Sequence, residues 1–224
     1  LTAFRAYGPA LQETGERAFG YDIWTKYNTT EPVVEARYEG ELNPDMKAKI
    51  AELGKTDPKA AQELYRSVSY HVDHGNGLDC YKVGPTLGGG TTALMAGDTI
   101  VYPYCYATQE ILDNGPLRFT VKLVYNPLVV KGDSTIIETR IITLDAGSYC
   151  NKTVVSYTNL KETMPLAVGI VLHEPDGAIV ADAANGYMTY VDPTDNAGGD
   201  NGKIFVGAAF PTLVKEAKAV LFPE

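Results

Sequence analysis

The chain has 224 residues, of which 45% are hydrophobic and 21% charged, ordinary values for a globular protein with a sizeable core. Nineteen Lys and Arg stand against 28 Asp and Glu, which gives a formal net charge of −9 at pH 7. Because a basic footprint is missing, we expect no nucleic-acid partner. No apolar stretch reaches 18 residues, so we expect no membrane-spanning helix.

The first predicted elements are short strands at residues 4–7 and 33–38. Asn43 then precedes proline and aspartate, the pattern of an N-cap followed by proline in the first helical turn. Asp57 repeats this signal in front of Pro58. The sequence therefore predicts a helical pair at about residues 44–67, inserted among strands, and favours a packing insert over an active-site lid.

A polar, glycine-containing segment follows at residues 70–84. It holds two of the three histidines of the chain, together with carboxylates, tyrosines and a lysine. Polar groups in a glycine-rich bend are typical of a binding loop. Further strands are predicted at residues 80–83 and 99–104.

Three consecutive strands are predicted at residues 117–123, 136–143 and 152–158. Their connections carry turn signals and are short, which favours an antiparallel meander over parallel strand–helix–strand units. More strands are predicted at residues 168–173, 187–191, 203–208 and 217–222. The expected fold class is all-β and mainly antiparallel: a large sandwich, in one domain over residues 1–224, with the short helical insert.

The sequence lacks the motifs of a metal site, a nucleotide-binding site and an acyl-transfer enzyme. His71, Asp73, His74 and His173 include zinc-type ligands, but the spacing of His71 and His74 suits a helix and the neighbouring glycines oppose one. The glycines at 88–90 lack the lysine of a phosphate loop, and no nucleophile elbow is present. We therefore predict no metal and no cofactor.

General acid–base chemistry remains, because histidine, tyrosine and lysine can donate and accept protons. The predicted catalytic residues are His74, His173, Tyr81 and Lys82, with His173 reaching the loop from another strand. The alternative is that these are hydrogen-bonded structural groups. Tyr81 and Lys82 alternate on a strand, so both face one cleft only if the strand is bulged.

A second set of residues is predicted to bind the ligand. If the meander strands pair as neighbours, Arg118, Lys122, Arg140 and Lys152 can share one sheet face and form a groove for a carboxylate. An ordinary solvated face with cross-strand ion pairs is the alternative. The predicted substrate-binding residues are Trp24, Lys26, His71, Asp79, Arg118 and Arg140, with Trp24 as a stacking platform.

The motifs Arg5-Ala6-Tyr7-Gly8-Pro9, Tyr21-Asp22-Ile23-Trp24, the 70–90 segment, Gly115-Pro116-Leu117-Arg118 and the residues leading to His173 occur in this order. Together they resemble an uncharacterised bacterial domain family of unknown function. The resemblance implies a galactose-mutarotase-like supersandwich and an origin in polysaccharide-utilisation loci. It also implies that this chain is a fragment of a longer protein with further β-rich segments.

From the resemblance and the candidate residues we expect a carbohydrate-active protein. Its ligand would be a sugar or a uronate-containing, pectin-like oligosaccharide, bound or processed by a lyase, an epimerase or a hydrolase. The alternative is a non-catalytic glycan-binding or structural protein. The resemblance implies a periplasmic or extracellular location.

Overall fold

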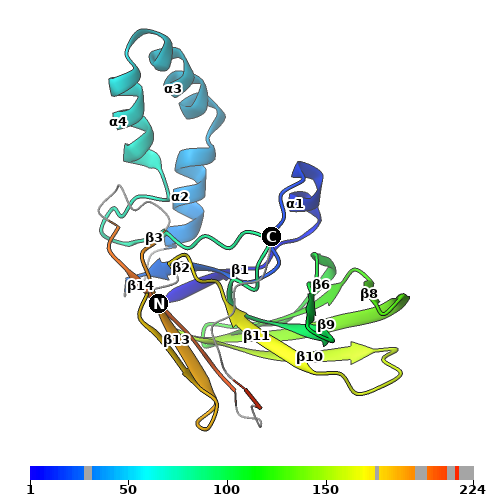
Figure 1. The fold of residues 1–224 in the computed structure, drawn as a ribbon. Helices are drawn as coiled ribbons and strands as arrows, with labels where there is room; N and C mark the ends of the chain where they lie inside the picture. The colour runs from blue at the N-terminus through cyan, green and yellow to red at the C-terminus, as the bar shows by residue number, and fades with distance from the viewer. Residues whose placement is uncertain (28–31, 175–176, 195–200, 211–214, 217–224) are drawn as a thin grey trace. The chain divides into compact units, whose positions relative to one another are not determined.

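The computed structural model describes residues 1–27, 32–174, 177–194, 201–210 and 215–216 (Figure 1). Contacts between residues divide the chain into two compact units, and each is described by itself. The first unit comprises Leu1–Phe4, Ile23–Tyr81 and Thr194–Gly202. The second comprises Arg5–Asp22, Lys82–Pro193 and the chain from Lys203 onward. The single domain expected over residues 1–224 stays a prediction.

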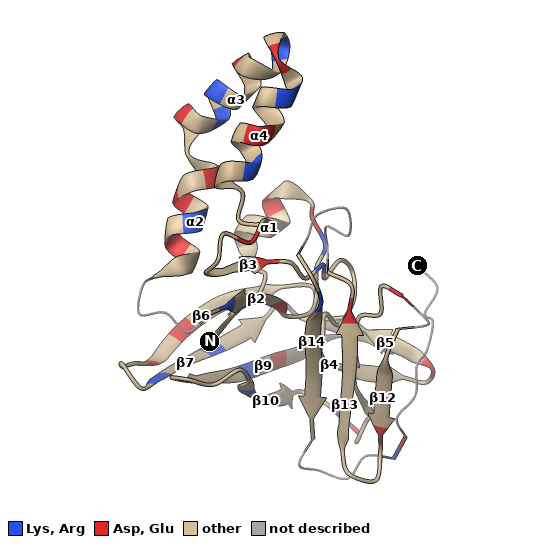
Figure 2. Ribbon diagram, turned by 90° about the vertical axis from the view of Figure 1, so that its left-hand side faces the viewer, with Lys and Arg blue, Asp and Glu red and all other residues tan. Residues whose placement is uncertain are grey.

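The first unit combines a small sheet with three helices. The sheet has the order β1 (Thr2–Arg5), β2 (Asp22–Lys26) and β3 (Gly77–Asp79). The helices are α2 (Val33–Leu42), α3 (Pro44–Thr56) and α4 (Pro58–Val68). Figure 2 shows charges of both signs interspersed along all three helices, as on a solvated surface.

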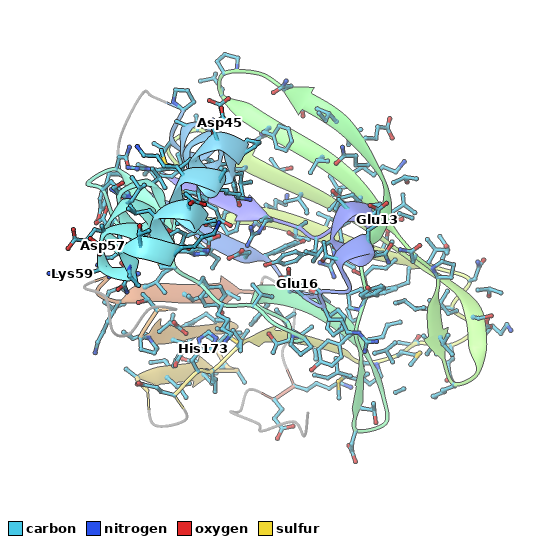
Figure 3. The ribbon with its side chains drawn as sticks, turned by 90° about the horizontal axis from the view of Figure 1, so that it is seen from above. Glu13, Glu16, Asp45, Asp57, Lys59 and His173 are labelled. Carbon is cyan, nitrogen blue, oxygen red and sulfur yellow. The ribbon has the colours of Figure 1, made fainter. Side chains whose placement is uncertain are left out.

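The predicted helical pair is confirmed as α3 and α4, which pack on each other. Asn43 caps α3 by accepting a hydrogen bond from the amide of Met46, and Asp57 caps α4 by accepting one from the amide of Ala60. Each cap satisfies an amide that the helix itself leaves unpaired. Figure 3 labels Asp57 and the first-turn residue Asp45, where carboxylates complement the positive end of the helix dipole.

The strand predicted at residues 33–38 is wrong, because this segment begins α2. After Pro32 at the N-cap, the run Glu35-Ala36-Arg37 consists of good helix formers, and the glutamate lies in the first turn. Tertiary contacts support the helix: Arg37 donates to the side chain of Asn76, and Glu41 accepts the amide hydrogen of Tyr70. A predicted strand at 80–83 is also absent, since β3 ends at Asp79.

The second unit is built mainly from an antiparallel sheet in the order β10-β9-β7-β6, with β8 paired to β9. The strands are β6 (Tyr106–Asn114), β7 (Arg118–Tyr125), β8 (Leu128–Val130), β9 (Asp133–Asp145) and β10 (Asn151–Thr158). The predicted meander is thus confirmed as β7, β9 and β10. The pairing of β7 with β6 shifts register at two places.

Two further sheets complete the second unit, which begins with a short helix, α1 (Pro9–Thr14). One sheet has the order β11 (Leu166–Ile170), β4 (Gly89–Ala96) and β5 (Thr99–Val101). The other has the order β12 (Ile179–Asp182), β13 (Tyr187–Asp192) and β14 (Ile204–Ala209). Strand β14 lies beside β4 and β11.

The sandwich character comes from packing between the sheets of the second unit. Leu94 of β4 is buried against Leu128 and Val130 of β8 and Ile136 of β9. A second buried cluster contains Leu87, Ala93 and Ile100. Because Ala93 directly precedes Leu94 on β4, this cluster lies on the other face of the strand. The mainly antiparallel β fold is therefore confirmed. The predicted strand at 217–222 lies outside the described residues.

In the part of the chain that the structure describes, no helix is long and apolar enough to cross a membrane.

Candidate acid–base site

His173 and Asp192 form a close, partly buried polar pair in the second unit. His173 lies three residues beyond the end of β11 (Figure 3). Asp192 ends β13 and is paired in register with Ile204 of β14. Nδ1 of His173 lies 2.5 Å from Oδ2 of Asp192. The Asp192 side chain is fully buried, whereas 24% of the His173 side chain is exposed.

This geometry suits proton transfer. A buried carboxylate on Nδ1 fixes the imidazole in the tautomer that carries its hydrogen there, holds the ring orientation and stabilises the protonated ring. The partly exposed ring is then a group that can exchange a proton with a ligand at its face to solvent. The pair is the structural unit of a general base or a general acid.

Sequence reasoning found His173 and missed Asp192. The aspartate follows a predicted strand and precedes Pro193, so it has the local signature of a turn residue. The signal that distinguishes it is its complete burial, because a carboxylate is hardly ever buried without a partner. That burial depends on the pairing of β13 with β14, which the local sequence does not display.

The histidines of the 70–84 segment belong to the first unit and brace its backbone. Nδ1 of His71 lies 3.0 Å from the carbonyl oxygen of Asp79, and Nε2 of His74 lies 2.9 Å from that of Ser69. A ring nitrogen facing a carbonyl must carry the hydrogen. Both contacts therefore hold the bend closed, as expected of structural polar groups.

Neighbouring groups tie the same bend at other points. Asp73 accepts hydrogen bonds from the amide of Gly75 and from the hydroxyl of Tyr27. Asn201 donates to the carbonyl oxygen of His71, so a residue far along the sequence also fixes the segment. The bend is an ordered part of the first unit.

Trp24 lies in the core of the first unit, with 5% of its surface exposed. Its ring is stacked on that of Tyr70 at 5.5 Å between centroids and is tilted against that of Tyr38 at 5.3 Å. These contacts account for Trp24 by packing, and a stacking platform for a sugar needs an exposed ring face. Lys26, at the end of the same strand β2, is half-buried.

Tyr81 and Lys82 have opposite environments. Tyr81 is buried with 3% of its surface exposed, and Lys82 is exposed. The strand on which the two side chains were expected to alternate is absent, and their place in one cleft stays a prediction. Lys82 belongs to the second unit and Tyr81 to the first.

The predicted cationic face is wrong for Arg140. Lys122 is paired with Ile141 and Leu123 with Arg140, so Arg140 points to the opposite face from Lys122. Arg118 and Lys152 do share the face of Lys122, through the pairs Arg118–Asp145, Lys152–Thr143 and Thr120–Thr143. The groove expected from four cations on one face is not formed.

Both arginines predicted to bind a uronate are engaged with carboxylates. Arg118 donates from Nε and Nη2 to Asp145 at 2.6 and 3.0 Å, in an exposed bidentate pair. The guanidinium of Arg118 lowers the pKa of that carboxyl below its usual value. Arg140 is buried and donates from Nε to Glu138 at 2.5 Å. It also donates to the carbonyl oxygen of Thr92 at 3.3 Å.

The described part of the chain contains no group of three or more histidine, cysteine or acidic residues arranged to hold a metal ion. An open hollow of about 490 Å³ lies in the second unit between Leu94 and the 157–166 segment. None of the predicted site residues lines it.

The ten predicted site residues divide between the two units. The first unit holds His71, His74, Tyr81, Trp24, Lys26 and Asp79; the second holds His173, Lys82, Arg118 and Arg140. The first unit brings His71 against Asp79, whose backbone is also paired in register with Trp24. The expected convergence of His74 with His173 joins different units and stays a prediction.

The family model described as "Domain of unknown function (DUF4861)" matches residues 1–220. A curated relative is "Uncharacterized protein P7" from Formosa agariphila, which is 27% identical over 195 residues. The alignment covers 84% of this chain and 42% of that protein, so the chain spans less than half of the length of its relative. No solved structure matches the chain.

Proposed function

We propose that this chain, which belongs to the DUF4861 family of domains of unknown function, is a carbohydrate-active protein that binds or processes uronate-containing oligosaccharides by acid–base chemistry. The observation that carries the proposal is the 2.5 Å contact between His173 and the buried carboxylate of Asp192. His173 is the proton-transfer group, and Asp192 holds the orientation of its ring.

The reaction type that makes most direct use of such a group is β-elimination from a uronate. The base removes the proton on the carbon beside the carboxylate, the bond from the next carbon to the glycosidic oxygen breaks, and that oxygen takes up a proton. His173 takes the first proton in this scheme, and Asp192 stabilises the imidazolium that results. Epimerisation shares the first step and then returns a proton to the opposite face of the same carbon, whereas hydrolysis uses the acid to protonate the leaving oxygen and the base to activate a water molecule.

A uronate substrate also needs its carboxylate neutralised. Arg118 and Arg140 are already paired with Asp145 and Glu138, so they supply little net charge for this purpose. Of the two exposed cations among the predicted residues of the second unit, Arg118 is held by Asp145, which leaves Lys82. We assign it to the substrate carboxylate or to the leaving oxygen.

The choice of carbohydrate rests on the sequence resemblance, with its polysaccharide-utilisation neighbourhood and its mutarotase-like supersandwich. The antiparallel sheets of the second unit agree with that class of fold. A periplasmic or extracellular location is part of the same proposal. Fold and neighbourhood raise the expectation of a sugar ligand and do not select a reaction.

A non-catalytic glycan-binding or structural role is the second candidate. It is favoured by the burial of Trp24 and by the carboxylate partners of both arginines, since these residues are accounted for without a substrate. In that case His173 and Asp192 would serve to order the turn after β11.

Calorimetry with a panel of uronic-acid oligosaccharides tests binding, and ultraviolet absorbance of the unsaturated uronate product tests elimination. We expect His173→Ala to abolish turnover while binding persists. His71→Ala is the matched control, because His71 belongs to the first unit and contacts the backbone carbonyl of Asp79 in that same unit. Binding without turnover would leave the glycan-binding role, and no binding to any member of the panel would contradict both.

A further inference from the structure

The turn that follows His173 is held by a buried tyrosine on β13. Tyr190 is 1% exposed, and its hydroxyl oxygen accepts the amide hydrogen of Glu174 at 3.0 Å. The same hydroxyl lies 3.4 Å from the carbonyl oxygen of Glu174, to which it donates. One phenol thus engages both backbone polar groups of the residue next to the histidine.

Gly177 shows how closely this turn lies against the tyrosine ring. Its amide donates to the carbonyl oxygen of Glu174 at 3.1 Å. A β-carbon at position 177 would lie 2.6 Å from Cε2 of Tyr190 and 3.2 Å from that carbonyl oxygen. Real β-carbons do not approach other atoms to 2.6 Å, so the contact requires glycine.

Tyr190 and Asp192 are two residues apart on β13 and therefore point to the same face of its sheet. One contacts the ring of His173, and the other contacts the backbone of the next residue. Both are buried on a strand that is paired on both sides, with β12 and with β14. The strand therefore presents two fixed contacts, separated by one repeat of the pleat, to consecutive residues of the turn.

We propose that Tyr190 is the positioning residue of the acid–base site: it fixes the turn so that Nδ1 of His173 meets Asp192. This inference rests on the proposed function of His173. The hydroxyl does not need to touch a substrate, because it acts through the Glu174 backbone. Removing it frees the turn and lets the imidazole leave the carboxylate.

The test is the tautomer of His173, read from nitrogen-15 chemical shifts of the imidazole ring. The chain has three histidines, so His71→Asn and His74→Asn variants assign the His173 signals by elimination. Tyr190→Phe removes the hydroxyl and keeps the ring. Gly177→Ala keeps the hydroxyl and displaces the turn. Tyr187→Phe is the matched control, an exposed tyrosine at the start of the same strand.

We expect the ratio of the Nδ1-hydrogen tautomer to the Nε2-hydrogen tautomer to fall about fivefold in Tyr190→Phe, because the hydroxyl that makes both contacts with Glu174 is lost and the net effect of such contacts is modest. Exchange of the Glu174 amide should accelerate by a similar factor. Gly177→Ala should reproduce both changes, and Tyr187→Phe neither. Spectra of Tyr190→Phe and Gly177→Ala that superimpose on that of Tyr187→Phe would overturn the inference.

These readings need no turnover, so they separate the inference from the proposed function. If the wild-type protein leaves all uronate oligosaccharides unchanged but the tautomer responds to Tyr190→Phe, the positioning contact stands and the catalytic proposal fails. If turnover depends on His173 but Tyr190→Phe leaves the tautomer unchanged, the catalytic proposal stands and the positioning role of Tyr190 fails.

Discussion

The carboxylate of Glu138 and the guanidinium of Arg140, two residues apart on β9, form an ion pair with 0% and 1% of their side chains exposed. The guanidinium carbon lies 4.4 Å from the ring centroid of Tyr125 and 5.4 Å from that of Tyr21. Two aromatic faces and one carboxylate thus compensate a charge that has left water. The pair is a structural element in the interior of the second unit.

We predict that Glu138→Ala destabilises the protein by about 3–5 kcal/mol, because it leaves Arg140 buried without its carboxylate. Glu138→Ala combined with Arg140→Met should recover much of this loss, since no charge remains in the interior. Urea denaturation measures both variants. Asp145→Ala is the control, because its exposed pair with Arg118 is solvated and should change the midpoint little. Equal losses in Glu138→Ala and Asp145→Ala would contradict the structural role of the buried pair.

Asp192→Asn keeps the size of the side chain and removes its charge. The amide group of asparagine is neutral, so it does not stabilise the imidazolium, and its nitrogen donates a hydrogen bond where the carboxylate accepts one. We therefore expect turnover to fall by roughly 10²- to 10⁴-fold. Rates on the best uronate oligosaccharide measure the effect, and circular dichroism checks the fold. Asp182→Asn, a half-buried aspartate that ends β12 in the same sheet, should retain full turnover. A fully active Asp192→Asn protein would remove the carboxylate from the mechanism.

The bend between Ser69 and Asp79 should depend on its two histidines for order. We predict that His71→Ala and His74→Ala accelerate amide hydrogen exchange across residues 69–79, because each loses the contact that spans the bend. His173→Ala should leave exchange in this segment unchanged. Full turnover in His71→Ala and His74→Ala would identify both as structural, whereas loss of turnover in His74→Ala with unaltered exchange would support the predicted catalytic role of His74.

The acid stability of the protein should include a contribution from Asp133. Hydrogen bonds from Lys161 and Thr135 hold the pKa of the Asp133 carboxyl well below its ordinary value. A folded-state pKa that is depressed means stability that is present above the unfolded pKa, near 4, and is lost as the pH falls below it. We therefore expect Asp133→Asn to lower the urea midpoint at pH 7.

The same variant should differ progressively less from the wild type as the pH falls from about 4 toward the depressed pKa of the folded state. Lys161→Met should show the same pH dependence, because it removes the partner that depresses the pKa. A difference between Asp133→Asn and the wild type that stays constant over this range would exclude the carboxylate as its source.

Local signals in the sequence were sufficient for some elements. The helices α3 and α4 follow from capping residues at Asn43 and Asp57, whose hydrogen bonds span only three residues. The meander follows from its short turns, which leave antiparallel neighbours as the favoured arrangement. In these cases the decisive interactions lie close together along the chain.

Features that depend on register or on distant pairing escaped prediction. The face of Arg140 is decided by its pairing with Leu123, and a shift of one residue in that pairing would place it beside Lys122. Helix α2 was hidden by the alternation of apolar and polar residues at 33–38, although contacts with Asn76 and Tyr70 stabilise the helix. Asp192 became a candidate only when the pairing of β13 and β14 buried it beside His173.

The two register shifts in β6 bear on the behaviour of the protein at high concentration. In the described part of the chain β6 ends its sheet, so its outer row of amides and carbonyls is a template for strands of other molecules. Extra residues between Tyr106 and Thr108 and between Ile111 and Asp113 interrupt the even spacing that a second strand would need. Glu110 and Asp113 add repulsion between identical edges. This border therefore resists the open-ended stacking of strands that leads to fibrils, despite the exposed apolar side chain of Ile111.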